Sequence, residues 1–273
     1  MPRKPAKPLP LKKDGTPMSA GAAKMKLLKS LKCTSKFEKK AWASGARFVA
    51  GVDEVGRGCL FGPVVAAAVI LEPEHRIRGL RDSKLIPEET REALAVKIRD
   101  RAIAISISFV DVETIDRINI YHASRLAMLN AVAQLLPLPD HLLVDAMVID
   151  FPSATDRLPQ TKIIHGDALS ASIAAASIIA KVERDRAMRE MAPKYPHYDL
   201  ASNKGYSAPK HLAALKTFGP TPLHRMSFAP VWTSHQSQET LAFMTEAGES
   251  VISGDVNVEE VLLTEGAAAG SGD

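Results

Sequence analysis

Two adjacent carboxylates, Asp53 and Glu54, end a short apolar run, and a Gly-Arg-Gly turn follows at residues 56–58. Neighbouring side chains of a strand point to opposite faces, so an acidic pair is unusual inside a half-buried strand. At a strand end the same pair offers oxygen ligands of the kind that Mg²⁺ and Mn²⁺ prefer. The turn adds backbone that a ligand can approach closely, and Arg57 adds a planar guanidinium suited to phosphate. This segment therefore predicts a metal site beside a reader of phosphate and sugar, which indicates a nuclease.

Two further acids could join this pair. Asp145 follows the apolar run 142–144, at the end of a predicted core strand, where ligand groups of open α/β sheets gather. Asp167 directly precedes a long predicted helix, where an N-cap is the ordinary role of an aspartate. Taken alone, Asp167 is better explained as a cap, and the two interpretations of Asp145 are evenly balanced. Asp150 competes with Asp145 but lies close to Pro152, where a turn is expected.

As a set, Asp53, Glu54, Asp145 and Asp167 favour a metal site over these separate explanations. Two cations about 3.5–4 Å apart that flank a phosphodiester need several carboxylates from different elements. One ion would activate the attacking water, and the other would stabilise the leaving 3′-oxygen. Two predicted strand ends and one helix start would supply such a set.

A second informative region, residues 194–225, interleaves basic and aromatic side chains around a single acid. Its basic residues other than histidine are Lys194, Lys204, Lys210, Lys216 and Arg225, and its tyrosines are Tyr195, Tyr198 and Tyr206. Such a surface favours phosphates and stacked sugars or bases. The alternative, a solvated face with packed tyrosines, is slightly favoured for this region in isolation. Lys84 could also contact phosphate, although an ordinary surface lysine is the commoner explanation.

Composition limits the class of protein. The chain has 273 residues, 46% of them hydrophobic, and its two cysteines, Cys33 and Cys59, form no CxxC pair. This argues against a disulfide framework or a structural zinc site and fits a reducing compartment. No apolar stretch is long enough to span a bilayer, and the N-terminus lacks the apolar segment of a secretory signal. We therefore expect a cytoplasmic protein.

The net charge of +4 is distributed unevenly, because residues 1–40 carry +10 and residues 235–273 carry −8. Basic arms commonly contact nucleic acid, whereas acidic ends are often solvated tails. For the basic arm, nucleic-acid contact and simple disorder are evenly balanced. We expect a basic, largely disordered arm over residues 1–44, a catalytic domain over 45–234 and an acidic, disordered tail over 235–273.

The elements that must position these residues alternate between strand and helix. Strands are predicted over 47–55, 63–71, 103–110, 141–144 and 161–164, and helices over 87–100, 121–135 and 169–191. The segment 24–40 could form a basic, weakly amphipathic helix. Two strands followed by alternating helices and strands indicate an α/β domain with a central mixed sheet.

From about Phe48 to Val231 the chain resembles bacterial ribonuclease HII, the type 2 ribonuclease H. The matching motifs, in chain order, are Gly51-Val52-Asp53-Glu54-Val55-Gly56-Arg57-Gly58, Asp82-Ser83-Lys84, Asn119-Ile120-Tyr121-His122-Ala123, Val144-Asp145, Gly166-Asp167, Ala175-Ala176-Ser177-Ile178-Ile179-Ala180-Lys181-Val182, Arg184-Asp185, Lys204-Gly205-Tyr206, His224-Arg225 and Ser227-Phe228. The resemblance implies a ribonuclease H-like fold, a central mixed sheet flanked by helices, with an added C-terminal helical segment. It also implies an endoribonuclease that cuts the RNA strand of RNA–DNA hybrids. Cleavage 5′ to ribonucleotides embedded in duplex DNA, giving 5′-phosphate and 3′-OH, and a two-metal mechanism with Mn²⁺ or Mg²⁺ are implied as well.

The resemblance also implies roles for single residues. The metal-binding, catalytic acids fall on Asp53, Glu54, Asp145 and Asp167. The turn that reads the ribose 2′-hydroxyl, the group that distinguishes RNA from DNA, falls on Gly56, Arg57 and Gly58. Tyr206 matches the ring that stacks on the next deoxyribose, and Lys84 and Lys204 fall on motifs of the substrate-binding surface. Asp185 matches a further acid of the family that is expected to support the site.

Five positions depart from the family's pattern, namely Cys59, Leu85, Ala208, Met226 and Ala229. Ala208 stands where a threonine is frequent, which puts one phosphate contact in doubt, but none of the five is one of the four acids. We expect a monomer that binds nucleic acid and no membrane. A ribonuclease HIII-like enzyme is one alternative, although the arm is too short and polar for its folded N-terminal domain. A non-catalytic nucleic-acid-binding protein is another, but it would not need four acids near a polyanion.

Overall fold

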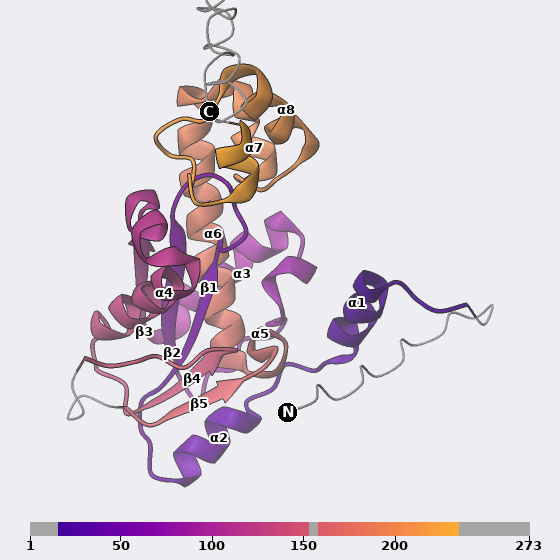
Figure 1. The fold of residues 1–273 in the computed structure, drawn as a ribbon. Helices are drawn as coiled ribbons and strands as arrows, with labels where there is room; N and C mark the ends of the chain where they lie inside the picture. The colour runs from indigo at the N-terminus through magenta and orange to yellow at the C-terminus, as the bar shows by residue number, and fades with distance from the viewer. Residues whose placement is uncertain (1–15, 153–157, 235–273) are drawn as a thin grey trace, which may run out of the picture.

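A five-stranded mixed sheet forms the centre of the computed structural model, which describes residues 16–152 and 158–234 (Figure 1). The strands are β1 (Val49–Val55), β2 (Val64–Leu71), β3 (Ala102–Val110), β4 (His141–Asp145) and β5 (Gln160–Ile163). Their order is β3-β2-β1-β4-β5. β1, β2 and β3 are successively antiparallel, whereas β4 pairs in parallel with both β1 and β5. The predicted α/β architecture with a central mixed sheet is confirmed.

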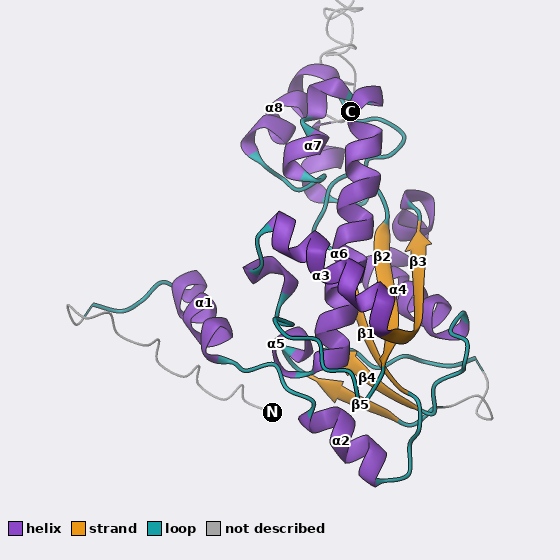
Figure 2. Ribbon diagram, turned by 180° about the vertical axis from the view of Figure 1, so that it is seen from behind, coloured by secondary structure: helices purple, strands orange, loops and turns teal. Residues whose placement is uncertain are grey.

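Helices cover both faces of this sheet and continue beyond it (Figures 1 and 2). The α-helices are α1 (Ala20–Ser30), α2 (Lys36–Ala43), α3 (Glu88–Arg101), α4 (Val112–Ala133), α5 (Gly166–Leu169), α6 (Ala171–Met191), α7 (Leu200–Asn203) and α8 (Pro209–Phe218). The 3-10 helices are η1 (Ser83–Leu85), η2 (Ala192–Lys194) and η3 (Pro196–Tyr198). In both views α7 and α8 lie past the end of the sheet, around the far end of α6. The C-terminal helical segment expected from the resemblance is therefore present.

The core divides into two layers because β2 is apolar on both faces. The even-numbered residues of β2 pack with buried side chains of α4, and the odd-numbered ones pack with α3 and α6. Successive side chains of a strand alternate between faces, so a strand covered on both sides must be apolar throughout. The run Val64–Ile70 is buried along its whole length, which explains its lack of polar residues.

Helix α4 begins nine residues earlier than the helix predicted from Tyr121. Asp111 caps the true start by accepting a hydrogen bond from the Thr114 N–H at 2.8 Å. Asn119 then interrupts the helix with φ 64° and ψ 163°, and its Oδ1 accepts from the N–H groups of Tyr121 and His122. The prediction found only the second half because this break removes the helical period across the junction.

The N-terminal arm, expected to be largely disordered over residues 1–44, contains both α1 and α2 within its described part. α2 contributes the buried Ala41 to a cluster with Val49 and Leu143, so it packs against the sheet. Residues 1–15 and the tail 235–273 lie outside the described residues, and their expected disorder stays a prediction. In the part of the chain that the structure describes, no helix has the length and apolar character of a membrane span.

Candidate active site

Asp53 and Glu54 lie near the end of β1, the central strand of the sheet. Asp53 is 4% exposed, and its Oδ1 accepts the backbone N–H of Glu54 at 2.8 Å. Oε1 of Glu54 forms an ion pair with Arg57 at 3.3 Å. The other oxygen, Oε2, is buried and has no hydrogen-bond partner among the described residues. A buried acceptor of this kind is costly unless a donor or a cation reaches it.

The ends of parallel strands meet at one edge of a sheet, and β4 therefore brings Asp145 to the same edge as β1. Asp167 is buried in the first turn of the short helix α5. Ser170, not Asp167, caps the long helix α6, because its Oγ accepts the Ile173 N–H at 3.3 Å. The interpretation of Asp167 as the cap of the long helix is wrong. The competing Asp150 pairs with Arg125 in the loop after β4.

Electrostatics shows that the four carboxylates share one region. Burial, followed by repulsion from Glu54, Asp145 and Asp167, raises the pKa of Asp53 well above its usual value. Burial and neighbouring carboxylates, Asp82 and Asp145, raise the pKa of Asp167 to about 6. Burial also raises the pKa values of Glu54 and Asp145. The structure thus brings together the four acids that the sequence predicted.

The donor set fits a hard divalent cation. Among the described residues, no group of three or more His, Cys, Asp or Glu side chains is already arranged to hold a metal ion. The four acids nevertheless supply only oxygen ligands, and one of their oxygens, Oε2 of Glu54, is buried without a partner. A cation would also relieve the repulsion that raises their pKa values. The chemistry of these residues therefore fits a hard divalent cation, which Asp53, Glu54, Asp145 and Asp167 would hold.

Lys84 lies beside this cluster in η1. Its Nζ is 4.0 Å from Oδ2 of Asp167, and the turn is held by Asp82, whose Oδ1 accepts the Lys84 N–H at 2.9 Å. Burial works against the charged amine, but Asp53, Asp167 and Asp82 raise the pKa of Lys84 above its usual value. The side chain is 69% exposed although its amine lies beside Asp167.

The Gly-Arg-Gly turn, residues 56–58, follows directly after the end of β1, the strand that carries Asp53 and Glu54. Gly56 has φ 92°, and a Cβ there would lie 2.2 Å from Nε of Arg184, so only glycine fits. At Gly58 a Cβ would meet nothing within 4 Å. The protein itself therefore does not require glycine at this second position, and its open backbone is available to a ligand. The Arg57 side chain is 42% exposed.

Two fully buried arginines connect this turn to the loop of Tyr206. Arg184 donates to the carbonyl of Lys204 at 2.7 Å, and Arg225 donates to the carbonyl of Arg57 at 3.0 Å. Cζ of Arg184 lies 5.9 Å from the centroid of the Tyr206 ring, and Tyr206 is 36% exposed. The sequence placed these two arginines in motifs but did not predict that they are buried, because arginine is mostly exposed in proteins.

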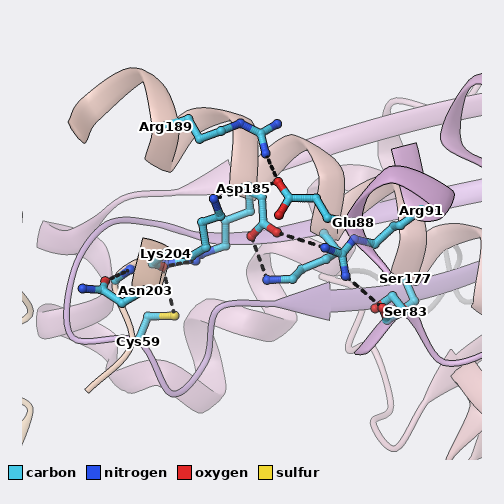
Figure 3. A network of polar contacts seen from close by, with 12 residues as sticks. Cys59, Ser83, Glu88, Arg91, Ser177, Asp185, Arg189, Asn203 and Lys204 are labelled. Carbon is cyan, nitrogen blue, oxygen red and sulfur yellow. Dashed lines mark hydrogen bonds and ion pairs between the residues drawn. The ribbon is translucent and has the colours of Figure 1, made fainter. Parts of the chain in front are cut away.

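Asp185 and Lys204 belong to a polar network between α6, α3 and η1 (Figure 3). Asp185 is paired with Lys181 at 2.7 Å and with Arg91 at 3.6 Å. Arg91 in turn donates to the carbonyl of Ser83 at 3.0 Å, next to Lys84. Asp185 therefore supports, through Arg91, the turn that carries Lys84, and its role at a catalytic site stays a prediction.

The amine of Lys204 joins this network through Oε1 of Glu88, which lies 4.0 Å away, and it also donates to the carbonyl of Ala201. The structure does not bring this side chain to the carboxylates. A contact between Lys204 and the substrate stays a prediction.

Comparison with known proteins gives consistent results for most of the chain. The family model described as Ribonuclease HII matches residues 50–231. A Ribonuclease HII from Koribacter versatilis (strain Ellin345) is 65% identical over 243 residues, which cover 89% of this chain and 94% of that protein. A Ribonuclease HII from Solibacter usitatus (strain Ellin6076) is 56% identical over 200 residues, covering 73% and 86%. The crystal structure of the ribonuclease H2 from Pyrococcus horikoshii OT3 is similar with a TM-score of 0.62 and 25% identity, covering 70% of this chain and 98% of that one.

Proposed function

The chain belongs to the ribonuclease HII family, and from this premise we propose that Asp53, Glu54, Asp145 and Asp167 form its catalytic centre. The protein is a ribonuclease H with the α/β fold of that group, an endonuclease that acts on the RNA strand of RNA–DNA hybrids. Enzymes of this family depend on divalent metal ions. Membership of the ribonuclease HII family argues against both alternatives considered from the sequence, a ribonuclease HIII-like enzyme and a non-catalytic binding protein.

The observation that carries the proposal is the position of Asp53. It is a buried carboxylate near the end of the central strand, and burial, followed by repulsion from three further acids, raises its pKa. We propose Mn²⁺ or Mg²⁺ as the ion that these oxygens hold. When bound, two such ions would activate a water and stabilise the leaving 3′-oxygen. Glu54 would contribute the oxygen that otherwise has no partner, and Asp145 and Asp167 would close the site from β4 and α5.

The proposed substrate surface combines the Gly-Arg-Gly turn, the ring of Tyr206 and the amine of Lys84. The open backbone of Gly58, with that of Gly56 and Arg57, would meet the 2′-hydroxyl, because this position has room for a ligand. The exposed part of the Tyr206 ring would stack on the following deoxyribose. Lys84 would contact a phosphate next to Asp167. The cut would then fall on the 5′ side of the ribonucleotide and leave 5′-phosphate and 3′-OH ends.

A set of three labelled duplexes tests this function: one with a single embedded ribonucleotide, one RNA–DNA hybrid and one of DNA alone. We expect cleavage of the first two with Mn²⁺ or Mg²⁺, none after chelation, and none of the DNA duplex. End-group analysis should find 3′-OH on the upstream fragment. Cleavage of the DNA duplex at the same rate, or a cut on the 3′ side of the ribonucleotide, would contradict the proposal.

A further inference from the structure

A segment before the family match reaches the element that carries Asp167. The match begins at residue 50, whereas the contacting segment covers residues 33–43. The Thr34 N–H donates to the carbonyl of Leu169 at 3.0 Å, and the Thr34 carbonyl accepts from the Ala171 N–H at 3.2 Å. This pair of bonds forms a parallel bridge between Thr34 and Ser170. The segment is therefore fixed to the junction between α5 and α6, three residues after Asp167.

Glu38 of α2 reinforces this junction from the same side. It is 2% exposed, and its Oε1 accepts from Oγ of Ser170 at 2.6 Å and from the Ser172 N–H at 2.8 Å. Ser170 Oγ is at the same time the cap that accepts the Ile173 N–H. A carboxylate here satisfies a free N–H group at the start of α6 and lies favourably at the positive end of the helix. Glutamate is rarely buried unless it is paired, and here Oε1 makes both hydrogen bonds, whereas Oε2 is buried with no hydrogen-bond partner among the described residues.

The first turn of α6 also lies directly against β1. A Cβ at Gly51 would lie 2.0 Å from the backbone carbon of Ser172, so strand and helix backbones are in direct contact there. Gly51 precedes Asp53 by two residues. Ala41 of α2 packs with Val49 of β1 in the same cluster. Both β1 and Glu38 therefore contact the first turn of α6, which directly follows α5 with Asp167.

We propose that residues 33–43, here called the N-terminal clamp, position Asp167 for metal binding, with Glu38 as the principal positioning residue. Glu38 does not belong to the metal-binding set in this proposal. It acts through Ser170 and Ser172, which fix the start of α6. The start of α6 in turn fixes the direction of α5, which directly precedes it. The inference rests on the proposed role of Asp167 and adds to it a part of the chain outside the family match.

Full-length variants of α2 test the clamp. Glu38→Leu removes both hydrogen bonds at similar volume, Glu38→Gln keeps the Oε1 acceptor, and Ala43→Ser changes an exposed, uncharged residue on the same helix as a control. Two quantities are measured, the affinity for Mn²⁺ alone by calorimetry and the kinetics on an RNA–DNA hybrid. We expect Glu38→Leu to weaken Mn²⁺ binding by about 10–100-fold and to lower kcat, with KM for the hybrid nearly unchanged. Glu38→Gln should keep most of the Mn²⁺ affinity and of kcat, and Ala43→Ser should change neither quantity.

A folded Glu38→Leu protein with the Mn²⁺ affinity and kcat of the parent would overturn the inference. If Glu38→Leu does not fold, Ser170→Ala is the milder variant, because it removes only the hydroxyl that Glu38 accepts from. The same loss of Mn²⁺ affinity is then expected, and unchanged affinity would overturn the inference equally. Asp167→Asn is measured in parallel. An active Asp167→Asn protein would contradict the proposed catalytic centre, whereas an inactive one beside a fully active Glu38→Leu would contradict the clamp alone.

Discussion

Asp145 accepts a hydrogen bond from the backbone N–H of Gly166, with 2.7 Å between Oδ1 and the nitrogen. The bond joins the last residue of β4 to the residue before Asp167, across 21 positions of the chain. A Cβ at Gly166 would lie 2.6 Å from Cδ1 of Ile173, so this backbone is also pressed against α6. Two acids of the proposed centre are therefore placed relative to each other by one short contact.

Asp53→Asn and Asp145→Asn should each abolish cleavage while leaving duplex binding largely intact. Each change removes one anionic oxygen from the metal-binding set but keeps the size of the side chain. A loss of at least about 100-fold in kcat is expected, since even supporting groups around a metal cost up to that amount. Cleavage rates on one RNA–DNA hybrid test the loss of activity, and a gel-shift titration with the same hybrid tests whether binding is retained. Asp150→Asn is the matched control, because Asp150 is 73% exposed and pairs with Arg125. Substantial activity in both variants would refute the centre.

Arg57→Ala and Tyr206→Ala should weaken the preference for a ribonucleotide junction more than they affect folding. Both side chains are partly exposed, and stacking of a ring on one nucleotide contributes about 1–3 kcal/mol. The ratio of kcat/KM for a single-ribonucleotide duplex to that for a hybrid measures this preference. Tyr206→Phe keeps the ring and should keep the ratio. An unaltered ratio in both alanine variants would show that these residues do not read the junction.

Asp185→Asn should destabilise the fold far more than the loss of a surface ion pair. The carboxylate is 4% exposed between Lys181 and Arg91, and removing one member of a buried pair costs about 3–5 kcal/mol. Arg189→Ala is the control in the same network (Figure 3), because Arg189 pairs with Glu88 at the surface and should cost at most about 1 kcal/mol. Urea unfolding midpoints compare the two. Equal losses would mean that Asp185 is not the centre of the network.

A chain of hydrogen bonds between two buried histidines predicts a pH dependence of stability. The Thr221 N–H donates to Nδ1 of His224 at 2.9 Å, so Nε2 of His224 carries the proton that it shares with Nε2 of His211 at 3.0 Å. Nδ1 of His211 then donates to the carbonyl of Tyr206 at 2.9 Å. Both rings must stay neutral for this chain to form. Burial, followed by the neighbouring His211, lowers the pKa of His224 to about 3.

The unfolded chain binds a proton at His224 below about pH 6.5, whereas the folded protein does so only near pH 3. The stabilisation by neutral His224 is complete above about pH 6.5 and is lost as the pH falls from there, by at most about 1.4 kcal/mol per pH unit. Urea unfolding of the parent and of His224→Asn at about pH 7.5 and about pH 5 measures the difference. The buried acids, whose pKa values are raised, change the stability in the opposite direction as the pH falls. Their effect is the same in the parent and in the variant, so it cancels in this comparison. A variant with the same pH dependence as the parent would contradict the neutral His224.

The main elements of the fold could be predicted because their signals are local. The apolar β2 and the alternating β3 determine strands through side chains only one or two positions apart. The position of Asp145 at a strand end followed from the three apolar residues before it. The kink of α4 at Asn119 could not be predicted. The positive φ of one asparagine interrupts the helix, and the spacing of apolar residues gives no sign of it. The cap of α6 was misplaced for a similar reason, because Asp167 and Ser170 are both good N-caps and only the path of the chain selects between them.

The sequence by itself determined which residues could do chemistry: Asp53, Glu54, Asp145 and Asp167, followed by the turn at 56–58. Residue type and neighbours pointed to Asp53 and Glu54, whereas Asp145 and Asp167 were selected as members of the set of four, because two cations need carboxylates from several elements. The tertiary structure alone decided what holds these residues in place. Glu38 meets Ser172 across 134 positions and Arg225 meets Arg57 across 168. Contacts over such distances depend on how the layers pack, and no local pattern of the chain records them.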